Sequence, residues 1–530
     1  MERSVRQHAA RRSTGPTALV AAAALFLASC GGGGDDAGDA QLAALGDARA
    51  LAADDAACAT RVNNTHAKLL QCVTLAGVRS HQAALQAIAD ANGGTRAAGT
   101  PGYDQSVQYI VGKLTAAGYA VSLNAFPFTY VALPLLRQTA PLAATYESGT
   151  FTGTGTGDVT AAVTAVDINL VAPRGNTSGC EAADFAGFPA GNIALVQRGT
   201  CSFAAKVLNA QAAGASAVII FNQGNTPDRE PLIVGTLVPT TASIPVVGAS
   251  FADGSALAQP GSAARVQVQA PQLVTQYNVI AESPGGDPNN VVMAGAHLDS
   301  VQRGPGINDN GSGSAAILET ALQMAKVKPR NKLRFAWWGA EESGLLGSNA
   351  YVAGLSADDK AKIALYLNFD MVGSPNHVFF IYDGDDSDQV GAGAGPGGSA
   401  QIEKVFEDFF TARGVPFKGS DFTGRSDYGA FIANGIPAGG LFTGAEGVKT
   451  AAEAALWGGT AGQQYDPCYH LRCDTYANNN DVALDVNSDA IAYTVLQFAM
   501  NTAVVNGQRG KGNFKLPPAE EDDHHGNATR

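Results

Sequence analysis

Residues 291–299 read VVMAGAHLD, an unbroken apolar run that ends in a histidine and an aspartate. A short continuous apolar run of this kind is typical of a strand buried on both faces, as in parallel sheets. Similar runs follow at 332–338 and 363–369. The alternation of strands with helices predicts an α/β fold with a mostly parallel central sheet flanked by helices. We expect further strands at 119–130, 277–282 and 377–382, and helices at 75–92, 103–117, 314–327, 347–353 and 399–413.

Residues that commonly bind metal ions follow three of these strands. His297 and Asp299 follow the first strand, Glu341 and Glu342 the second, and Asp370 the third. In open α/β sheets, ligands bind beyond the carboxyl ends of the strands. We therefore expect these side chains to meet at one edge of one sheet.

A fifth acidic residue, Asp309, lies in a loop that leads into the helix predicted after the first strand. Carboxylates packed this closely would repel one another and take up protons unless a cation were present. A pair of divalent metal ions removes that conflict and gives the cluster a chemical use. His470 is our choice for a further ligand, because the other histidines outside the leader precede the sheet, lie in the tail or open a strand. A bridge between Cys468 and Cys473 would stiffen the His470 loop.

Residues 131–272 differ in character from the rest of the chain. Thr, Val and Gly dominate, and short β-like runs occur at 163–170, 193–196 and 218–221, with a helix predicted at 202–213. The pattern from Ile193 to Asn222 resembles the protease-associated domain, which is non-catalytic in the families that carry it. We interpret 131–272 as an inserted β-rich domain of this kind.

The motifs around the predicted metal ligands resemble the secreted co-catalytic dizinc aminopeptidase family. This family includes bacterial leucyl aminopeptidases, aminopeptidase Y and the glutamate carboxypeptidases. The resemblance covers 75–130 and 273–506 and implies the zinc exopeptidase fold for this dizinc peptidase domain. The motifs are HLDS at 297–300, NDNGSG at 308–313, WGAEESGLLGS at 338–348, NFDM at 368–371 and CYH at 468–470.

The resemblance implies two Zn²⁺ ions held by five side chains. His297 and Asp370 would be ligands of one zinc, Glu342 and His470 would be ligands of the other, and Asp309 would bridge both.

Other roles follow from the same resemblance. Glu341 would be the general base, and Tyr469 would hydrogen-bond the tetrahedral oxyanion. Asp299 would orient His297 without binding the metal itself. Arg425 resembles a substrate-contacting arginine of the family.

Two smaller expectations come from relatives in this family. The peptide bond after the bridging aspartate is cis in them, which predicts a cis bond between Asp309 and Asn310. Asp485 and Asp489 match positions that hold Ca²⁺ in one branch of the family, and this makes calcium a second candidate cofactor.

The N-terminus has the pattern of an export signal. Four arginines precede an apolar run at 17–28, which is too short to span a bilayer comfortably. The run ends in Leu-Ala-Ser-Cys30, which resembles a bacterial lipoprotein signal with Cys30 as the lipidated residue. The alternative is an ordinary secretory signal. We therefore expect residues 1–29 to be removed, and the protein to be lipid-anchored to a cell-envelope membrane or secreted. We expect a tether at 30–74 and a disordered tail at 507–530.

The six cysteines other than Cys30 form three pairs that are close in sequence. We predict the disulfides Cys58–Cys72, Cys180–Cys201 and Cys468–Cys473, because an oxidising compartment makes such pairs persistent. The alternative is six free, buried thiols.

Composition excludes some classes of function. The 530 residues are 45% hydrophobic and 15% charged, which rules out wholesale disorder. The net charge of −13 argues against nucleic acid as a partner. Peptides are the expected substrates, and the only membrane contact expected is a lipid anchor at Cys30. The sequence leaves the oligomeric state open.

These observations favour an exported zinc aminopeptidase. Two alternatives share its fold: a dizinc carboxypeptidase, which would need basic residues in its specificity pocket, and a single-zinc glutaminyl cyclase, against which the full two-metal ligand set speaks. The third alternative is a non-catalytic peptide-binding protein, which a missing ligand or base would favour.

Overall fold

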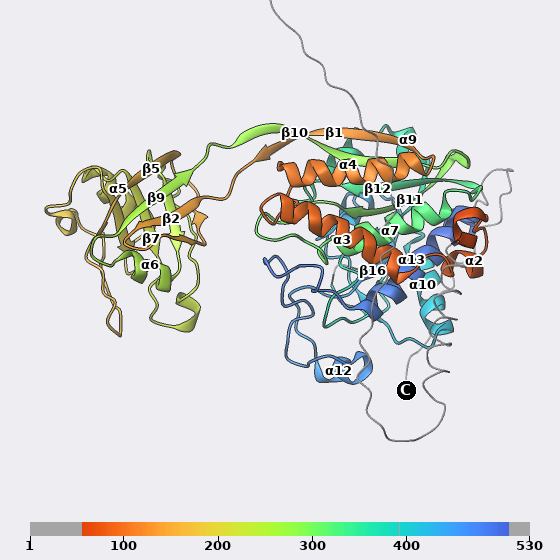
Figure 1. The fold of residues 1–530 in the computed structure, drawn as a ribbon. Helices are drawn as coiled ribbons and strands as arrows, with labels where there is room; N and C mark the ends of the chain where they lie inside the picture. Colours follow the sequence, from red (N-terminus) through yellow and green to blue (C-terminus); the bar gives the residue numbers. More distant parts are fainter. Residues whose placement is uncertain (1–55, 392, 508–530) are drawn as a thin grey trace, which may run out of the picture. The chain divides into compact units, whose positions relative to one another are not determined.

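The computed structural model describes residues 56–391 and 393–507 and contains two eight-stranded sheets, each with its own helices and hydrophobic core (Figure 1). The predicted signal at 1–29, Cys30 and most of the predicted tail lie outside the described residues. No helix within the described ranges is both long and apolar enough to cross a membrane.

The first sheet carries the predicted metal ligands. Its strands, in spatial order, are β1 (Ala120–Tyr130), β10 (Gln272–Glu282), β12 (Asn331–Trp338), β11 (Asp287–His297), β13 (Ile363–Phe369), β16 (Ala438–Phe442), β14 (Phe380–Tyr382) and β15 (Lys418–Ser420). The four central strands β12, β11, β13 and β16 run parallel, whereas β1, β10 and β14 pair in antiparallel fashion. The predicted α/β fold with a mostly parallel sheet is confirmed.

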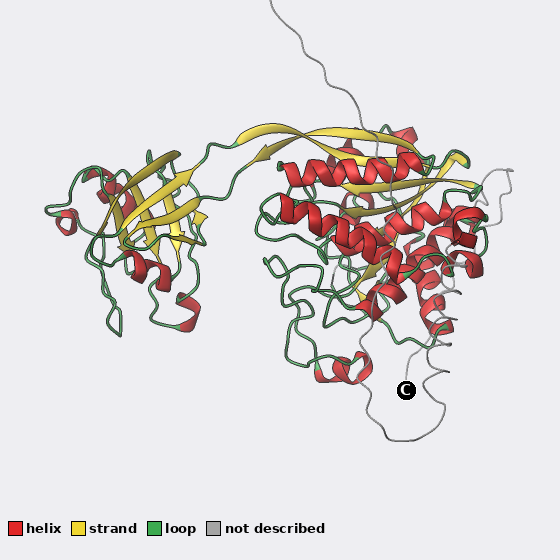
Figure 2. Ribbon diagram, viewed as in Figure 1, coloured by secondary structure: helices red, strands yellow, loops and turns green. Residues whose placement is uncertain are grey.

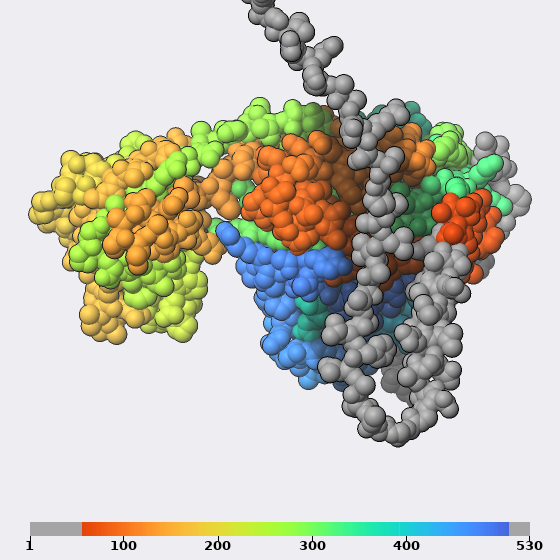
Figure 3. Space-filling model, in the orientation of Figure 1, coloured from red at the N-terminus to blue at the C-terminus, as the bar shows by residue number. Residues whose placement is uncertain are grey.

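Helices cover both faces of this sheet (Figure 2). They are α2 (His66–Leu70), α3 (Leu75–Ala91), α4 (Pro101–Ala116), α7 (Gly311–Met324), α8 (Leu346–Gly354), α9 (Ala357–Ala361), α10 (Ser399–Ala412), α11 (Tyr428–Ile432), α12 (Ala451–Trp457), α13 (Asp481–Met500) and α14 (Ala503–Asn506). Atoms of α3 and α4 belong to the orange area near the middle of Figure 3.

The packing of strand β11 shows why its residues 291–296 are all apolar. Val292 and Ala294 belong to the core with α3, α7 and α13, whereas Val291 and Met293 belong to the core on the opposite face with α8 and α11. Successive strand residues point to opposite faces, so a strand covered on both sides needs apolar residues at every position. This packing places the end of β11, and therefore His297, in the interior.

Strand β16 and helix α13 are among the elements of this sheet unit that were not predicted. Strand β16 contains two adjacent glycines, Gly439 and Gly440, which weaken any strand pattern in the sequence. Helix α13 is apolar nearly all round and gives no clear amphipathic signal. The strand predicted at 377–382 is shorter, because only Phe380–Tyr382 pair with neighbours.

The second sheet lies within 131–272. Its strands, in spatial order, are β3 (Ala144–Tyr146), β2 (Leu135–Ala140), β9 (Ala263–Val268), β5 (Gly157–Ala165), β6 (Ile193–Gln197), β7 (Ala217–Phe221), β8 (Val246–Ala249) and β4 (Gly149–Thr150). Helices α5 (Phe203–Ala212) and α6 (Phe251–Leu257) and two short 3-10 turns, Ala182–Phe185 and Pro227–Arg229, complete it. The unit is β-rich, as predicted, but the strand expected at 163–170 lies earlier in the chain, at β5.

The segment 56–74 is folded, in contrast to the tether that we expected over 30–74. It contains α2, whose Leu69 is buried in the core together with residues of α13. His66 stacks on Tyr493 of α13. Residues 30–55 lie outside the described residues.

All three predicted disulfides are present: Cys58–Cys72, Cys180–Cys201 and Cys468–Cys473. The predicted cis peptide bond between Asp309 and Asn310 is also present.

Candidate metal centre

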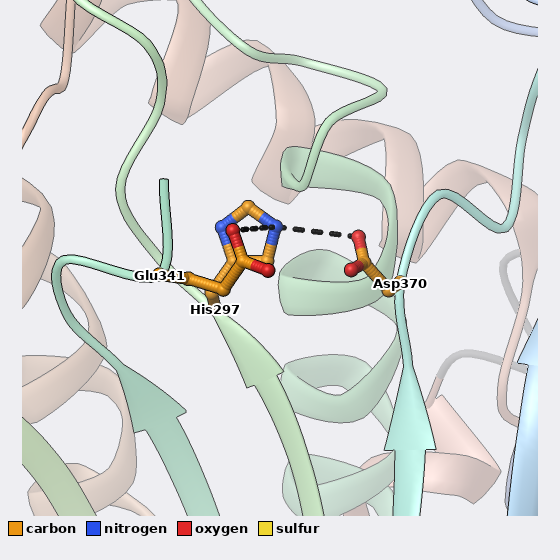
Figure 4. A group of neighbouring side chains, drawn as sticks. All are labelled: His297, Glu341 and Asp370. Atoms are coloured by element: carbon orange, nitrogen blue, oxygen red, sulfur yellow. Dashed lines mark hydrogen bonds and ion pairs between the residues drawn. The ribbon is translucent and has the colours of Figure 1, made fainter. Parts of the chain in front are cut away.

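Three neighbouring parallel strands bring the predicted ligands to one edge of the sheet. His297 is the last residue of β11 and lies opposite Trp338, the last residue of β12. Glu341 and Glu342 follow β12, and Asp370 follows β13 directly. In Figure 4 the carboxylate of Glu341 overlaps the His297 ring and that of Asp370 lies beside the ring. The sheet register alone therefore gathers residues that are up to 73 positions apart.

The first ligand group is centred on His297, which is 1% exposed. Its Nε2 lies 3.2 Å from Oδ1 of Asp370 and 3.2 Å from Oδ1 of Asp309. Oε2 of Glu341 is 3.9 Å from the same nitrogen. One ring nitrogen therefore faces three carboxylates.

The second group is centred on His470. Its Nε2 lies 3.2 Å from Oδ2 of Asp309 and 3.0 Å from Oε2 of Glu342. One carboxylate oxygen of Asp309 thus faces each histidine, as expected for a ligand that two neighbouring metal sites share.

Asn310 fixes the loop that carries Asp309. Its Oδ1 accepts hydrogen bonds from the N–H groups of Gly313, in the first turn of α7, and Met371, and its Nδ2 donates to the carbonyl oxygen of Phe369. The helix passes so close to the end of β13 that a Cβ at Gly313 would lie 2.1 Å from that carbonyl oxygen. Glycine is required here because of this approach. The contact ties the Asp309 loop to the strand end that carries Asp370.

The pKa values of the two adjacent glutamates of the cluster, Glu341 and Glu342, are raised in the protein without metal. Burial raises the pKa of Glu341 well above its usual range, and it raises the pKa of Glu342 to about 7. Burial alone would lower the pKa of His470, but its hydrogen bonds to Asp309 and Glu342 outweigh this and raise that pKa to about 10. Protons thus occupy positions that a cation would otherwise fill.

The donor set fits a divalent metal ion. Imidazole nitrogens and carboxylate oxygens are the usual ligands of zinc. Ligand atoms of His297, Glu341 and Asp370 lie within 4.8 Å of one another, and so do those of Asp309, Glu342 and His470. In addition, Oε1 of Glu342 is buried and has no hydrogen-bond partner. A buried polar atom without a partner is costly, and a metal ion would remove that cost.

The loop of His470 is a small covalent ring. The Cys468–Cys473 disulfide closes it across five positions, and His470 adopts a left-handed backbone conformation with φ of 60°. The Tyr469 ring stacks on the His470 ring with centroids 3.8 Å apart. His470 is the most exposed of the predicted ligands, with 41% of its side chain accessible.

Tyr469 and Arg425 contact each other at the rim of the site. Nη2 of Arg425 donates to the Tyr469 hydroxyl at 3.3 Å, and Nη1 donates to Oε1 of Glu446 at 2.8 Å. Burial and the carboxylates of Asp309 and Glu342 raise the pKa of the Tyr469 phenol, so this group keeps its proton.

Asp299 contacts both His297 and Glu341. Nδ1 of His297 lies 3.1 Å from the backbone oxygen of Asp299 and 3.7 Å from its Oδ1. The same Oδ1 accepts a hydrogen bond from the N–H of Glu341 at 3.2 Å. The nearer partner of the imidazole is therefore the backbone oxygen of Asp299 and not the carboxylate.

A cavity of about 610 Å³ opens onto both ligand groups. Its walls include both aromatic and apolar side chains and metal-ligand candidates. The apolar and aromatic members are Leu345, Met371, Phe380, Tyr382, Tyr428, Phe442, Tyr465 and Tyr469.

Two residues near the centre were missed in the sequence. The hydroxyl of Ser426 donates to Oδ2 of Asp370 at 2.6 Å, and Asp427 is buried beside it. Burial raises the pKa of Asp427 to about 7. Both residues directly follow Arg425 in the chain, but a serine and an aspartate in a loop give no signal of their own.

The calcium expectation finds little geometric support. Oδ2 of Asp489 accepts a hydrogen bond from Arg413 at 2.6 Å, and neither Asp485 nor Asp489 belongs to a group of three ligand atoms within the described ranges. A third acidic group, formed by Asp383, Asp385 and Glu403, lies at the end of β14 and on α10.

Comparisons with known proteins agree with this architecture. Residues 278–495 match the family model described as Peptidase family M28, and residues 166–257 match the PA domain. The chain is 52% identical over 450 residues to a protein named "Aminopeptidase" from Pseudomonas aeruginosa, covering 83% of this chain and 84% of that protein. It is 42% identical over 449 residues to "Probable lipoprotein aminopeptidase LpqL" of Mycobacterium tuberculosis, covering 82% and 87%.

Among solved structures, the chain resembles BSAP, a zinc aminopeptidase from Bacillus subtilis. The TM-score is 0.55 at 25% sequence identity, and the match covers 80% of this chain and 95% of that one. This chain belongs to peptidase family M28 and carries a PA domain.

Proposed function

We propose that this protein is an exported dizinc aminopeptidase, which removes N-terminal amino acids from peptides. The observation that carries the proposal is the position of Asp309, whose two oxygens face His297 and His470 at 3.2 Å each. The names of two relatives as aminopeptidases and of one structural neighbour as a zinc aminopeptidase support it.

The residues present fit two Zn²⁺ ions. His297 and Asp370 would hold one ion, Glu342 and His470 the other, and Asp309 would bridge them. When bound, a zinc pair acts as a Lewis acid that lowers the pKa of water and polarises a carbonyl group.

Glu341 is the proposed general base. Its carboxylate faces the His297 group at 3.9 Å, farther than Asp309 and Asp370, which leaves it free to accept a proton. A base must lie within hydrogen-bond reach of the proton that it takes, and a pKa near the working pH favours proton transfer. Burial raises the pKa of Glu341 in that direction. Glu341 would take a proton from the attacking water and pass it to the leaving amine.

Tyr469 is the proposed partner of the oxyanion. Its phenol keeps its proton and lies on the His470 ring at the wall of the cavity. A hydroxyl aimed at the position where negative charge develops lowers the barrier of acyl transfer. Arg425 holds that hydroxyl through the contact between Nη2 and the phenol oxygen.

The side chains of the cavity favour an aminopeptidase. The cavity contains six carboxylate residues, Asp309, Glu341, Glu342, Asp370, Asp421 and Glu446, and one arginine, Arg425. Two Zn²⁺ ions would offset four of the six negative charges, so the argument rests on the basic side chains that the cavity offers to a substrate. A carboxypeptidase would need basic residues, and the one arginine is already paired with Glu446. The cavity therefore favours the aminopeptidase over the carboxypeptidase.

Export is part of the proposal. Three disulfides are consistent with an oxidising compartment, and one relative is named a probable lipoprotein aminopeptidase. We infer that the protein leaves the cytoplasm and that Cys30 is the site of lipid attachment. Labelling with a radioactive fatty acid, compared between the full-length protein and Cys30→Ser, tests the anchor.

The experiment that tests the activity compares blocked and free substrates. Purified protein is given leucine anilide, N-acetyl-leucine anilide and a peptide with a free C-terminus but a blocked N-terminus. The proposal predicts hydrolysis of the first compound alone. Cleavage restricted to the blocked peptide would identify a carboxypeptidase, and no cleavage of any compound would favour a binding protein.

A further inference from the structure

The carboxylate of Asp474 binds the backbone of the segment that contains Asp309. Oδ1 accepts the N–H of Asn308 at 2.8 Å, and Oδ2 accepts the N–H of Asp309 at 3.0 Å. The backbone oxygen of Asp474 also accepts the N–H of Ile307 at 3.1 Å. Three consecutive amides are therefore bound by one residue, which is only 2% exposed.

Asp474 belongs to the same loop as His470. It directly follows Cys473, so it stands at the base of the ring that the Cys468–Cys473 disulfide closes. His470 and Asp474 thus reach Asp309 from the same loop, one at its side chain and the other at its backbone.

Two neighbours brace Asp474. Nδ2 of Asn478 lies 3.1 Å from Oδ1 of Asp474 and 2.9 Å from Oδ1 of Asp466. Asp466 in turn accepts a hydrogen bond from the side-chain amide of Asn308 at 2.7 Å and from the N–H of Cys468 at 2.8 Å. Both flanks of the disulfide ring are therefore attached to the segment before Asp309.

A buried cation holds the other side of the same loop. Arg96 is 0% exposed and donates to the carbonyl oxygens of Leu298, Pro305 and Gly306 at 2.5, 2.9 and 2.6 Å. The chain between β11 and α7 is thus held through its carbonyls by Arg96 and through its amides by Asp474. This arrangement leaves Asp309 little freedom to move relative to His470.

We propose that Asp474 is a positioning residue that sets the separation of Asp309 from His470 and thereby the affinity of the metal pair. The inference rests on the proposed function, because it assumes that both residues are metal ligands. Groups that hold metal ligands from behind typically change metal affinity or activity by about 10- to 100-fold when they are removed. A residue that served only folding would change stability and leave the affinity of the folded protein intact.

The test uses full-length Asp474→Asn, which keeps the size of the side chain but leaves one of the two N–H groups without an acceptor. Zinc affinity is measured by competition with a chelator, and Co²⁺ absorption reports the ligand geometry. We expect zinc affinity to fall about 10- to 100-fold, the Co²⁺ spectrum to shift, and kcat to fall with KM changed less than about twofold. Zinc affinity within about twofold of the unchanged protein would overturn the proposal, even if thermal stability fell.

A milder variant covers the case in which Asp474→Asn fails to fold. Asn478→Ala removes the contacts of Nδ2 to Oδ1 of Asp474 and to Oδ1 of Asp466 and leaves both aspartates in place, and we expect zinc affinity to fall by less than in Asp474→Asn. Unchanged affinity in this variant would contradict the proposal. Asp408→Asn is the matched control, because Asp408 is an exposed residue of α10 that pairs with Lys404. It should leave affinity, spectrum and rate unchanged.

Measurements on the wild-type protein distinguish failure of the proposed function from failure of the proposed role of Asp474. If this protein binds no zinc and hydrolyses no leucine anilide, the proposed function fails. If it does both and Asp474→Asn equals it in zinc affinity, only the role of Asp474 fails.

Discussion

Glu341 and Glu342 are neighbours in the chain, yet their carboxylates face different histidines. Oε2 of Glu341 lies 3.9 Å from Nε2 of His297, whereas Oε2 of Glu342 lies 3.0 Å from Nε2 of His470. Both histidines also contact Asp309, so the two glutamates differ in their distance to the imidazole nitrogen. We propose on the basis of these two distances that Glu342 is a ligand and Glu341 the base, although the two residues have identical side chains.

Replacement of these glutamates should therefore have different effects on metal content. Glu341→Gln should lower kcat by about 10²- to 10⁴-fold, because a general base typically contributes that much, and should keep its zinc. Glu342→Gln should lose zinc together with activity. Zinc analysis of both purified variants, beside steady-state kinetics, checks this prediction. Loss of zinc from Glu341→Gln with retention in Glu342→Gln would reverse the two roles.

Zinc binding should release protons at neutral pH. The pKa of His470 stands at about 10 in the protein without metal, because its bonds to Asp309 and Glu342 outweigh the effect of burial. A ligand histidine must be neutral, so zinc displaces that proton below pH 10. Zinc affinity should rise with pH, by up to about tenfold per unit for each proton released.

Calorimetric titration of the metal-free protein at pH 7 in two buffers of different ionisation enthalpy measures this release. His377→Gln is a suitable control, because burial lowers the pKa of His377 to about 4 and keeps it neutral. Equal heats in both buffers for the unchanged protein would contradict the assignment of His470.

The side chain of the first substrate residue should be apolar. The cavity has a wall of aromatic and apolar residues, among them Met371, Phe380 and Phe442, and its charged groups are mainly carboxylates. We expect kcat/KM for leucine anilide to exceed that for glutamate anilide by at least about tenfold, since burial of a Leu-sized side chain contributes about 1.5–3 kcal/mol. A preference for glutamate would show that the cavity does not hold the first residue.

Glu453 should stabilise the fold in a pH-dependent way. Burial alone would raise its pKa, but hydrogen bonds from Thr450, Lys418 and Tyr465 lower that pKa to about 2. Because the folded pKa lies below the usual value, the stabilisation is complete above about pH 4.5 and is lost as the pH falls toward 2. Glu453→Gln should cost about 1–3 kcal/mol at pH 7 and almost nothing at pH 2. Urea unfolding of the wild-type protein and Glu453→Gln at several pH values measures the difference in unfolding free energy. A difference that does not change with pH would contradict this prediction.

Much of the fold could be predicted because β11, β12 and β13 contain apolar runs, at 291–296, 335–338 and 363–367, and polar residues follow soon after each run. An apolar run of this kind is visible in the sequence without any knowledge of long-range contacts. Strand β16 was not readable, because Gly439 and Gly440 remove the side chains on which a strand pattern depends.

The candidate site also contains residues that the sequence predicts and contacts that it does not. His297, Glu342 and Asp370 were placed together by the alternation of strands and helices, and the geometry brings them together. The bonds of Asp474 to Asn308 and Asp309 join residues about 165 positions apart, and no periodicity in the sequence encodes such a contact. Long-range support of this kind becomes visible only when the chain is folded.

The number of zinc ions per chain tests the central claim most directly. Full-length protein is purified, dialysed against metal-free buffer and analysed for zinc and protein concentration, with leucine anilide hydrolysis followed in the same samples. The account predicts two zinc ions per chain at full activity. One zinc ion or none in a fully active sample would contradict it.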